Sequence, residues 1–533
     1  MKARKWKKNS VSTTGTGRSE RKGGFAVYVS PVSWAIIIGY LILCCALGSY
    51  ISYKNKTRSN ADFYNSNRAL PALAVAMVVQ GTSISGVAFL GTPGNMYSYG
   101  WGQWINACTL GGNFVIITAA LAVGRPIRSI SEKLDSLSIN GLLSTIYQDD
   151  RVLYPGSIAI LIFGTLFAMV QWVSIGNLFS TLLGVSYTLA IIIGVIVVML
   201  YTIFGGNTSN SYLSIAQMFI AMFASIYLVI VGLRVSGGLT ELNNFLMQYD
   251  PDLMKLGNDG WPLMTIISYC IIYGIGSIGH PAIAQKFYGL KSKKDIPLTM
   301  FIGIIAQVVT TAMGFIGLVV LQQVEIGNLA PLAMPDNATP TFIGAFCGPF
   351  AAGLIVAACL AAIMTTGASL VMQSANTVAV DIIGGMLHRD TEGKKGVMIS
   401  RISMICVFLI SCVLALNPVG TIQSMGAACW VCFSTVFCGP IFLGLRWRRA
   451  TKQGCLVSMW FGLILTPVLR GAIIFGGWQW PLAIDCGVVC MFATLIVFIV
   501  VSLCTPAQDK SHFMPPKRSE LIKMRAAKEE AKA

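Results

Sequence analysis

The sequence has few charged residues, and its long apolar stretches contain almost none of them. Only 11% of the 533 residues are Asp, Glu, Lys or Arg, whereas a soluble globular domain has about 25%. Hydrophobic residues make up 55% of the chain. Between Arg151 and Arg234 there is no Asp, Glu, Lys, Arg or His at all. This composition excludes a soluble fold and predicts an all-α integral membrane protein.

Titratable side chains at membrane depth are equally scarce. No pattern of nucleophile, base or metal ligands stands out, which argues against an enzyme and against a bound cofactor. A proton-coupled transporter usually needs a titratable group within its spans. The candidates are His280 and the pair Arg470 and Asp485 near the outer ends of the last two spans. Sodium is the more economical coupling ion, because the oxygens that bind it need not titrate.

Neither a disulfide framework nor a nucleic-acid surface is indicated. Most of the 15 cysteines lie inside apolar runs, where they behave as small hydrophobic residues. Cys429 and Cys432 form a C-x-x-C within a span, with no second pair and no nearby His, which favours a structural role. The net charge of +17 comes from Lys and Arg in short connections, as in the cytoplasmic loops of membrane proteins.

Thirteen apolar runs are long enough to cross a bilayer. The first, Pro31–Tyr53, is too long for a signal-peptide core and is expected to be retained. The others cover roughly 70–92, 102–124, 156–181, 186–204, 212–233, 261–284, 297–322, 345–380, 399–417, 421–445, 454–477 and 480–504. We therefore expect a basic disordered tail (1–30), one membrane domain (31–504) and a charged tail (505–533).

The distribution of cations predicts the orientation of the chain in the plasma membrane. Cation-rich loops alternate with loops that carry mainly Asp and Glu, and the cation-rich loops are expected inside. They lie around 54–68, 125–133, 286–294, 389–395 and 446–452, and the basic C-terminal tail joins them. An odd number of spans then places the basic N-terminus outside. The alternative is a span count that is wrong by one at the start.

The stretch 350–381 combines a membrane-length apolar run with hydroxyl groups at its centre. Thr365 and Thr366 are adjacent there, and Gly367, Ala368 and Ser369 follow. Hydroxyl oxygens at mid-membrane depth replace part of the water shell of a small cation such as sodium. The alternative is that these hydroxyls bond back to their own helix or join neighbouring helices.

Two other spans are interrupted by glycine or proline near their centres. Gly81–Gly86 interrupts the second span, and Gly274–Pro281 interrupts the span that comes five later. Paired interruptions of this kind mark discontinuous helices at a mid-membrane binding site. The spacing predicts a five-plus-five inverted repeat, with core repeats at about 70–234 and 261–445. The alternative is that these glycines only allow close helix packing.

Several segments resemble the sodium:solute symporter family, and their order and spacing resemble it as well. They are TSISGVAFLGTPGNMYSYGWGQW (82–104), LYTIFGG (200–206), GSIGHP (276–281), PFAAGLIVAACLAAIMTTGASLVMQSANTVAVDI (349–382) and GLRWRRATKQG (444–454). Some of these motifs look most like those of sodium/pantothenate symporters. Proline, sugar, monocarboxylate and sialic acid members share most of these positions.

The resemblance implies a LeuT-like fold with flanking helices, including one ahead of the ten-helix core, and alternating access around a central site. It implies a sodium site made by Gly81, Ile84, Ala362, Thr365 and Thr366. The positions it implies for the solute are Gln80, Thr82, Ser85, Gln171, Trp172, Tyr273, Ser277, His280 and Trp430.

Two positions depart from the family pattern. Ser214 aligns where many members carry an acid, and Ser83 stands where an acid or amide often precedes a helix 1 ligand. The resemblance therefore gives no support for a second sodium ion.

Together these features predict a symporter that imports a small polar solute with sodium, with an organic anion such as pantothenate as the first candidate. The alternatives are a proline-like amino-acid symporter, a monocarboxylate symporter or a transporter-like solute sensor. A passive channel would need rings of polar pore-lining residues instead of localised helix breaks.

Overall fold

The computed structural model describes residues 30–55, 68–104, 111–134, 136–391, 393–510 and 513. Within these residues the chain consists of helices and turns without a β-strand, apart from one isolated bridge between Leu70 and Leu290. The expected disordered segment 1–30 lies outside the described residues except for its last residue, and so does most of the C-terminal tail. The all-α prediction is confirmed.

The helices fall into three groups by length and continuity. The long ones are α1 (Pro31–Asn55), α9 (Leu153–Leu183), α10 (Tyr187–Val235), α17 (Pro349–Asn376), α18 (Gly393–Ala415), α19 (Ile422–Arg446), α20 (Lys452–Ile474) and α21 (Cys486–Cys504). The segments of interrupted or bent spans are α3 (Ala72–Ser83), η2 (Val87–Gly91), α4 (Thr92–Tyr99), α6 (Gly111–Thr118), η4 (Ala119–Gly124), α7 (Arg125–Lys133), α12 (Leu263–Gly274), η7 (Ile275–Gly279), α13 (Pro281–Lys286), α14 (Ile296–Thr311), η10 (Ala312–Phe315), α15 (Ile316–Glu325) and η12 (Thr377–Met386). Short connecting helices include α5 (Gly102–Trp104), α8 (Ile139–Tyr147), α11 (Leu239–Tyr249), η9 (Lys293–Asp295), η11 (Pro335–Asn337) and α16 (Ala338–Phe346).

The described part of the chain contains ten helices that are long and apolar enough to span a membrane. The number rises to twelve if each of two bent pairs is one span. The remaining expected span, 186–204, corresponds to the shorter apolar helix Tyr187–Leu200, which continues within α10. The other apolar segment of α10, Ser209–Val235, matches the expected span 212–233, so the two expected spans are present as two separate apolar segments.

Both predicted interruptions are real breaks in the helices. The axis bends by 55° between α3 and the helix that starts at Val87, and by 50° at His280. Ile84 has extended backbone angles (φ −84°, ψ 90°), so its carbonyl leaves the helical hydrogen-bond ladder. His280 is also extended (φ −87°, ψ 105°) and precedes Pro281. Proline disfavours a helical conformation in the residue before it, which explains the second break.

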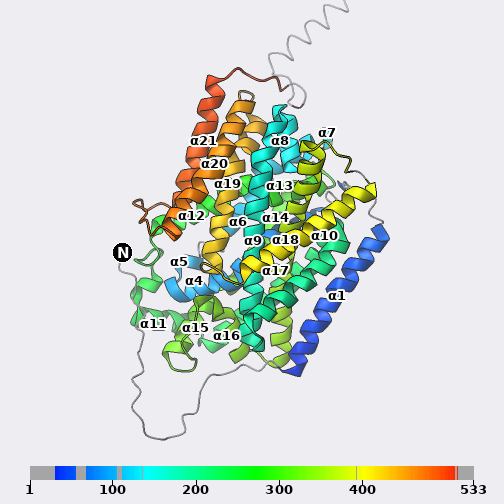
Figure 1. Ribbon diagram of the computed structural model, residues 1–533. Helices are drawn as coiled ribbons and strands as arrows, with labels where there is room; N and C mark the ends of the chain where they lie inside the picture. Colours follow the sequence, from blue (N-terminus) through cyan, green and yellow to red (C-terminus); the bar gives the residue numbers. More distant parts are fainter. Residues whose placement is uncertain are drawn as a thin grey trace, which may run out of the picture.

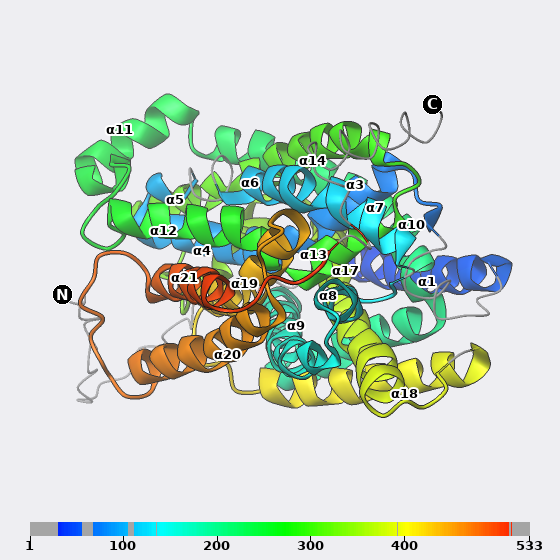
Figure 2. The same ribbon diagram turned by 90° about the horizontal axis from the view of Figure 1, so that it is seen from above.

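Helix α17 runs through the centre of the bundle. Its span is Pro349–Met386, and 94% of the most apolar 18-residue segment of this span is buried inside the protein. The corresponding share is 28% for α1 and 28% for α20. Figures 1 and 2 show α1 at one edge of the bundle and α20 and α21 at the opposite edge. The hydroxyl-rich stretch of α17 therefore faces other helices and does not face lipid.

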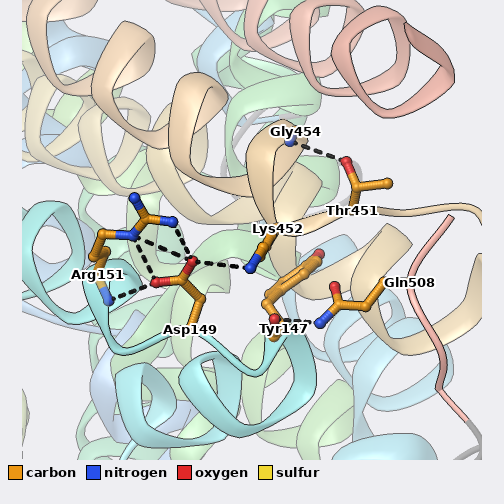
Figure 3. A network of polar contacts seen from close by, with 7 residues as sticks. All are labelled: Tyr147, Asp149, Arg151, Thr451, Lys452, Gly454 and Gln508. Atoms are coloured by element: carbon orange, nitrogen blue, oxygen red, sulfur yellow. Dashed lines mark hydrogen bonds and ion pairs between the residues drawn. The ribbon is translucent and has the colours of Figure 1, made fainter. Parts of the chain in front are cut away.

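One end of the bundle carries the basic loops, and a polar network there joins distant parts of the chain (Figure 3). We call it the basic end. Asp149, after α8, pairs with Arg151 at 2.7 Å and approaches Lys452 at the start of α20 at 3.8 Å. The amide of Gln508, from the tail, donates to the backbone carbonyl of Tyr147. This network fixes α8 against α20 and the chain that follows α21.

Candidate functional site

The first break and the hydroxyl-rich stretch of α17 are in direct contact. The Thr366 hydroxyl donates to the carbonyl of Gly81 at 2.6 Å, and it lies 3.2 Å from the carbonyl of Ala362 one turn earlier. All three residues are buried. Three of the predicted sodium ligands therefore meet as uncharged oxygens between α3 and α17.

Glycine at position 81 allows this approach. A Cβ in place of the Gly81 hydrogen would lie 2.5 Å from the Thr365 Cγ2 methyl, closer than carbon atoms tolerate. The fourth predicted ligand, Ile84, is fully buried just beyond this contact. Two residues later the chain lies between α9 and α17, because a Cβ on Gly86 would overlap Ser174 Oγ and would be 3.5 Å from Ile363 Cγ1.

Thr365, the fifth predicted ligand, directs its hydroxyl to another helix. It donates to Gln217 Oε1 on α10 at 2.6 Å and lies 2.9 Å from the Ala361 carbonyl. The Gln217 amide nitrogen in turn donates to the Tyr40 hydroxyl of α1 at 3.1 Å. Thr365 thus joins α17 to α10 and α1, whereas Thr366 joins α17 to α3.

Gln217 belongs to a polar stripe on α10 that the sequence argument did not identify. The stripe consists of Asn210, Ser214 and Gln217, which share one face of the helix at spacings of four and three residues. Asn210 Nδ2 donates to the Ser369 hydroxyl at 3.2 Å, and its oxygen is buried without a partner. The hydroxyl of Ser214 bonds back to the Asn210 carbonyl at 2.7 Å. The periodicity of these polar residues in an apolar span is the signal that could have found them.

The other polar residues of α3 are occupied by contacts within the protein. The Thr82 hydroxyl bonds back to Val78 at 2.7 Å and lies 3.4 Å from the Ser369 hydroxyl. Ser83 donates to Gln80 Oε1 at 2.9 Å. Gln80 Nε2 donates to the Gly303 carbonyl of α14 at 2.7 Å. Gln80 and Thr82 therefore orient α3 against α14 and α17.

Helix α9 holds the other side of the first break. Gln171 is fully buried, and its Oε1 accepts from the backbone nitrogen of Gly86 at 3.2 Å. The Ser85 hydroxyl accepts from the Val87 nitrogen at 3.1 Å. These two predicted solute residues satisfy backbone groups that the break exposes, so they stabilise the interruption itself.

Aromatic side chains surround the second break. The imidazole centroid of His280 lies 4.4 Å from the ring centroid of Trp430, 4.8 Å from that of Phe433 and 6.2 Å from that of Phe167. Tyr273 packs edge-to-face against Trp430, with 5.2 Å between the ring centroids. We call these five residues the aromatic cage. Phe167 also lies one turn from Gln171 on α9. The cage therefore lies where α9, α19 and the second break meet.

The polar atoms of the aromatic cage have no partner within the described structure. Both imidazole nitrogens of His280, the Tyr273 hydroxyl and the Trp430 indole nitrogen are buried and unbonded. A buried polar atom without a partner costs about 1–3 kcal/mol. Several such atoms in one cluster indicate a place where a ligand or water supplies hydrogen bonds during the working cycle.

Trp172 and Ser277, two of the predicted solute residues, make their hydrogen bonds outside the aromatic cage. The Trp172 indole nitrogen donates to Ser411 on α18 at 2.8 Å, and its ring packs on Gly367 and Phe408. Trp172 thus fills the space between α9, α17 and α18. The Ser277 hydroxyl donates to the Gly274 carbonyl at 2.7 Å and lies 3.2 Å from the Val115 carbonyl.

Charged groups do not enter this region. Arg470 and Asp485 form an ion pair of 2.5 Å, and Asp485 also caps the first turn of α21. Among the described residues, no three His, Cys, Asp or Glu side chains group together as a metal site. Cys429 and Cys432 are free and buried. The site is therefore built from neutral oxygens on α3 and α17 and from neutral donors and aromatic rings around His280.

Comparison with known proteins agrees with this architecture. A model of the sodium:solute symporter family matches residues 63–462. The high-affinity proline transporter PutP of Bacillus subtilis is 30% identical over 421 residues, which cover 78% of this chain and 87% of that protein. The osmoregulated proline transporter OpuE of the same organism is 28% identical over 436 residues, with coverage of 80% and 86%. The sodium/pantothenate symporter of Haemophilus influenzae is 27% identical over 421 residues, with coverage of 77% and 85%.

Among solved structures, a substrate-bound, outward-open Na+-coupled sialic acid symporter superposes with a TM-score of 0.74. The match has 18% sequence identity and covers 90% of this chain and all of that one. At this identity the likeness concerns the fold alone, and it confirms the predicted LeuT-like architecture with flanking helices.

Proposed function

The chain belongs to the sodium:solute symporter family, and we propose that it imports a small organic anion, such as pantothenate, together with sodium. Membership makes it a multi-pass plasma-membrane protein, a sodium-coupled solute transporter and not an enzyme. The identity of the solute, the ion ligands and the orientation of the chain are the proposed parts.

The proposed sodium site comprises the carbonyls of Gly81, Ile84 and Ala362 and the hydroxyls of Thr365 and Thr366. The Thr365 hydroxyl, which donates to Gln217 on α10 in this structure, would turn toward α3 to bind the ion. The observation that carries it is the 2.6 Å contact between Thr366 Oγ1 and the Gly81 carbonyl. Sodium would separate these two oxygens and bind both, because ion–dipole contacts strengthen in a low dielectric. Ion binding would then order the junction of α3 and α17 and favour the conformation that receives the solute.

The aromatic cage supports an organic anion as the solute. Trp430 supplies an N–H that only donates, and Tyr273 supplies a hydroxyl. Neutral His280 supplies one donor and one acceptor. A carboxylate accepts several such hydrogen bonds, and the rings of Phe167 and Phe433 pack against an uncharged body. Donors without a nearby carboxylate suit an anion better than a cation.

Proline is the second candidate, because two of the similar proteins above are named proline transporters. Its carboxylate would use the same donors. Its ammonium group would need acceptors, and the described membrane spans provide carbonyls and aromatic faces for it without any carboxylate near the aromatic cage.

The charge distribution supports an outside N-terminus and an inside C-terminus. The Ser33 hydroxyl, at the start of α1, donates to the Pro349 carbonyl at the start of α17. The start of α1 therefore lies at the end opposite the basic end, which is proposed to be inside. The last helix, α21, ends beside Thr451 at the basic end.

Uptake into proteoliposomes tests the proposal. Labelled pantothenate, proline and lactate are compared, with external sodium or with choline at equal osmolarity, and protein-free liposomes serve as the control. We expect sodium-dependent, saturable uptake of pantothenate that excess unlabelled proline does not inhibit. Sodium-driven uptake of proline alone would replace the anion with the second candidate, and equal rates in sodium and choline would refute coupling.

A further inference from the structure

A cationic cleft at the basic end is separate from the ion and solute region. It has a volume of about 450 Å³ and is lined by Arg125, Pro126, Ser129, Lys293 and Lys294. Three of these five residues are cationic and none is acidic. The first three lie on α7 and the two lysines lie on η9, so two segments that are distant in sequence form its walls.

A buried arginine holds the two walls together. Arg128, on α7, does not line the cleft; it is 5% exposed and donates to the carbonyls of Leu290 and Lys291 at 2.5 and 3.3 Å. Its remaining charge is paired with Glu132 at 2.6 Å. The Ser292 hydroxyl then accepts from the Lys294 nitrogen at 3.2 Å and shapes the turn that carries both lysines. The cleft is therefore a built feature of the fold.

The cations that line the cleft are available to a ligand. Within the described part of the chain, no ion pair joins Arg125, Lys293 or Lys294 to an acid. Arg446 adds a further positive charge nearby, since it donates to the carbonyls of Leu121 and Ala122 at 2.8 Å each. Asp295 ends η9 but does not line the cleft, so the lining keeps three cations and no acid, which favours an anion.

Exposed apolar side chains lie about one helical turn from the cations on both walls. Leu121 precedes Arg125 by four residues and is 59% exposed, and Leu298 follows Lys294 by four residues and is 53% exposed. Phe301, at the next turn of α14, is 61% exposed. In a spanning bundle these side chains contact acyl chains, so the cations stand at the depth of the lipid headgroups.

We propose that this cleft binds the phosphate of an anionic phospholipid, with phosphatidylglycerol as the simplest example. Arg125, Lys293 and Lys294 contact the phosphate, while Leu121, Leu298 and Phe301 contact the acyl chains. Basic pockets between membrane helices bind anionic headgroups in this way. The apolar side chains on both walls place the cations directly beside acyl chains, and this position favours the headgroup of a lipid over a soluble phosphate compound.

Native mass spectrometry of the delipidated full chain in detergent tests the proposal. Dioleoyl phosphatidylglycerol and dioleoyl phosphatidylcholine are titrated against the parent and against Lys293→Gln/Lys294→Gln. The matched control is Arg389→Gln/Lys395→Gln, which removes two exposed charges at the basic end outside the cleft. Each charge is worth about fivefold in affinity. We expect the cleft variant to bind phosphatidylglycerol roughly 25-fold more weakly and the control to remain within about threefold of the parent.

Three further arms keep the test decisive. Lys293→Arg/Lys294→Arg keeps the charge and should retain binding, which separates loss of charge from misfolding. Glycerol 3-phosphate at millimolar concentration should not displace the lipid, and phosphatidylcholine should bind equally to all variants. The proposal is overturned if the cleft and control variants lose affinity equally, if phosphatidylglycerol binds no better than phosphatidylcholine, or if glycerol 3-phosphate competes at the lipid's own affinity.

Discussion

Removal of the Thr366 hydroxyl should weaken sodium dependence more than removal of any neighbouring hydroxyl. In the structure this hydroxyl donates to the Gly81 carbonyl at 2.6 Å. A hydrogen bond to a charged group contributes about 1.5–3 kcal/mol, and a neutral one contributes about 1 kcal/mol. In the parent, sodium binding replaces the neutral bond between the Thr366 hydroxyl and the Gly81 carbonyl. The Thr366→Ala variant loses the contact between the hydroxyl and the ion, but it has no such neutral bond to break. The net loss is about 0.5–2 kcal/mol, which is about a 2- to 30-fold rise in the sodium concentration for half-maximal uptake.

Ser369 provides the matched control on the same helix. Its hydroxyl lies 3.4 Å from Thr82 Oγ1 and 3.2 Å from Asn210 Nδ2, which are long contacts. Ser369→Ala should therefore raise half-maximal sodium by less than about threefold. Thr366→Ser keeps the hydroxyl and should lie near the parent, whereas Thr366→Val keeps the shape and should behave like Thr366→Ala.

The assay is uptake of labelled solute into proteoliposomes over a series of sodium concentrations, with choline as the replacement cation. Reconstituted protein is quantified for every variant, so that a lower maximal rate is not mistaken for weaker ion binding. The reasoning fails if Thr366→Ala and Ser369→Ala shift half-maximal sodium equally. It also fails if Thr366→Val retains the parent value.

Three other outcomes are expected. Gln217→Leu removes the acceptor of the Thr365 hydroxyl and should lower the free energy of unfolding by about 1–2 kcal/mol. Thermal denaturation in detergent measures this loss, and a Tm equal to the parent's would contradict the observed 2.6 Å bond. Trp430→Phe keeps an aromatic ring but removes a hydrogen-bond donor, so it should raise the KM for an anionic solute about 5- to 10-fold and leave the sodium concentration for half-maximal uptake unchanged. A change in that sodium concentration without a change in KM would show that Trp430 is not part of the solute site. Burial raises the pKa of Asp336 to about 6, so protonation favours the arrangement in which Asp336 is buried, and this effect is lost as pH rises through 6. Uptake should therefore fall as external pH drops from 7.5 to 5, and an equally steep fall in Asp336→Asn would exclude this carboxylate.

The expectation for Asp336 rests on its contacts at the end opposite the basic end. Its carboxylate accepts from the Ile422 backbone nitrogen at the start of α19 at 3.0 Å, and its other oxygen has no partner. It is packed against Gly94 of α4, and burial is the main cause of the raised pKa. If this end opens during transport, the carboxylate gains water and its pKa returns toward about 4. The conformational cost of keeping an ionised Asp336 buried is about 3 kcal/mol.

The general plan could be predicted because it depends on features that are local in sequence. Apolar runs of bilayer length predict spans, and Gly81 and Pro281 mark the two breaks because their effect on the backbone is intrinsic. The adjacent hydroxyls of Thr365 and Thr366 predict a polar point in α17. None of these inferences requires knowledge of which helices are neighbours.

The detailed contacts could not be predicted because they depend on which helix faces which. Residues 365 and 366 are adjacent, but they are about 100° apart around α17, so they face α10 and α3 respectively. The partner Gln217 lies about 150 residues earlier in the chain, and only the assembled bundle brings it to Thr365. Trp172 and Gln171 are also adjacent in sequence, but their side chains have different roles because they face different helices. Its indole faces α18, whereas the Gln171 amide faces the first break.

The two ends of the first break suggest how a bundle with so little charge couples an ion to a solute. Gly81 is held by Thr366 of α17, and Gly86 is held by Gln171 of α9. Phe167, one turn from Gln171, contacts the His280 and Trp430 rings of the aromatic cage. Sodium would act on the first end, and the solute would act through α9 on the second. Each ligand then favours the backbone geometry that the other requires, and this reciprocity needs no titratable relay between them.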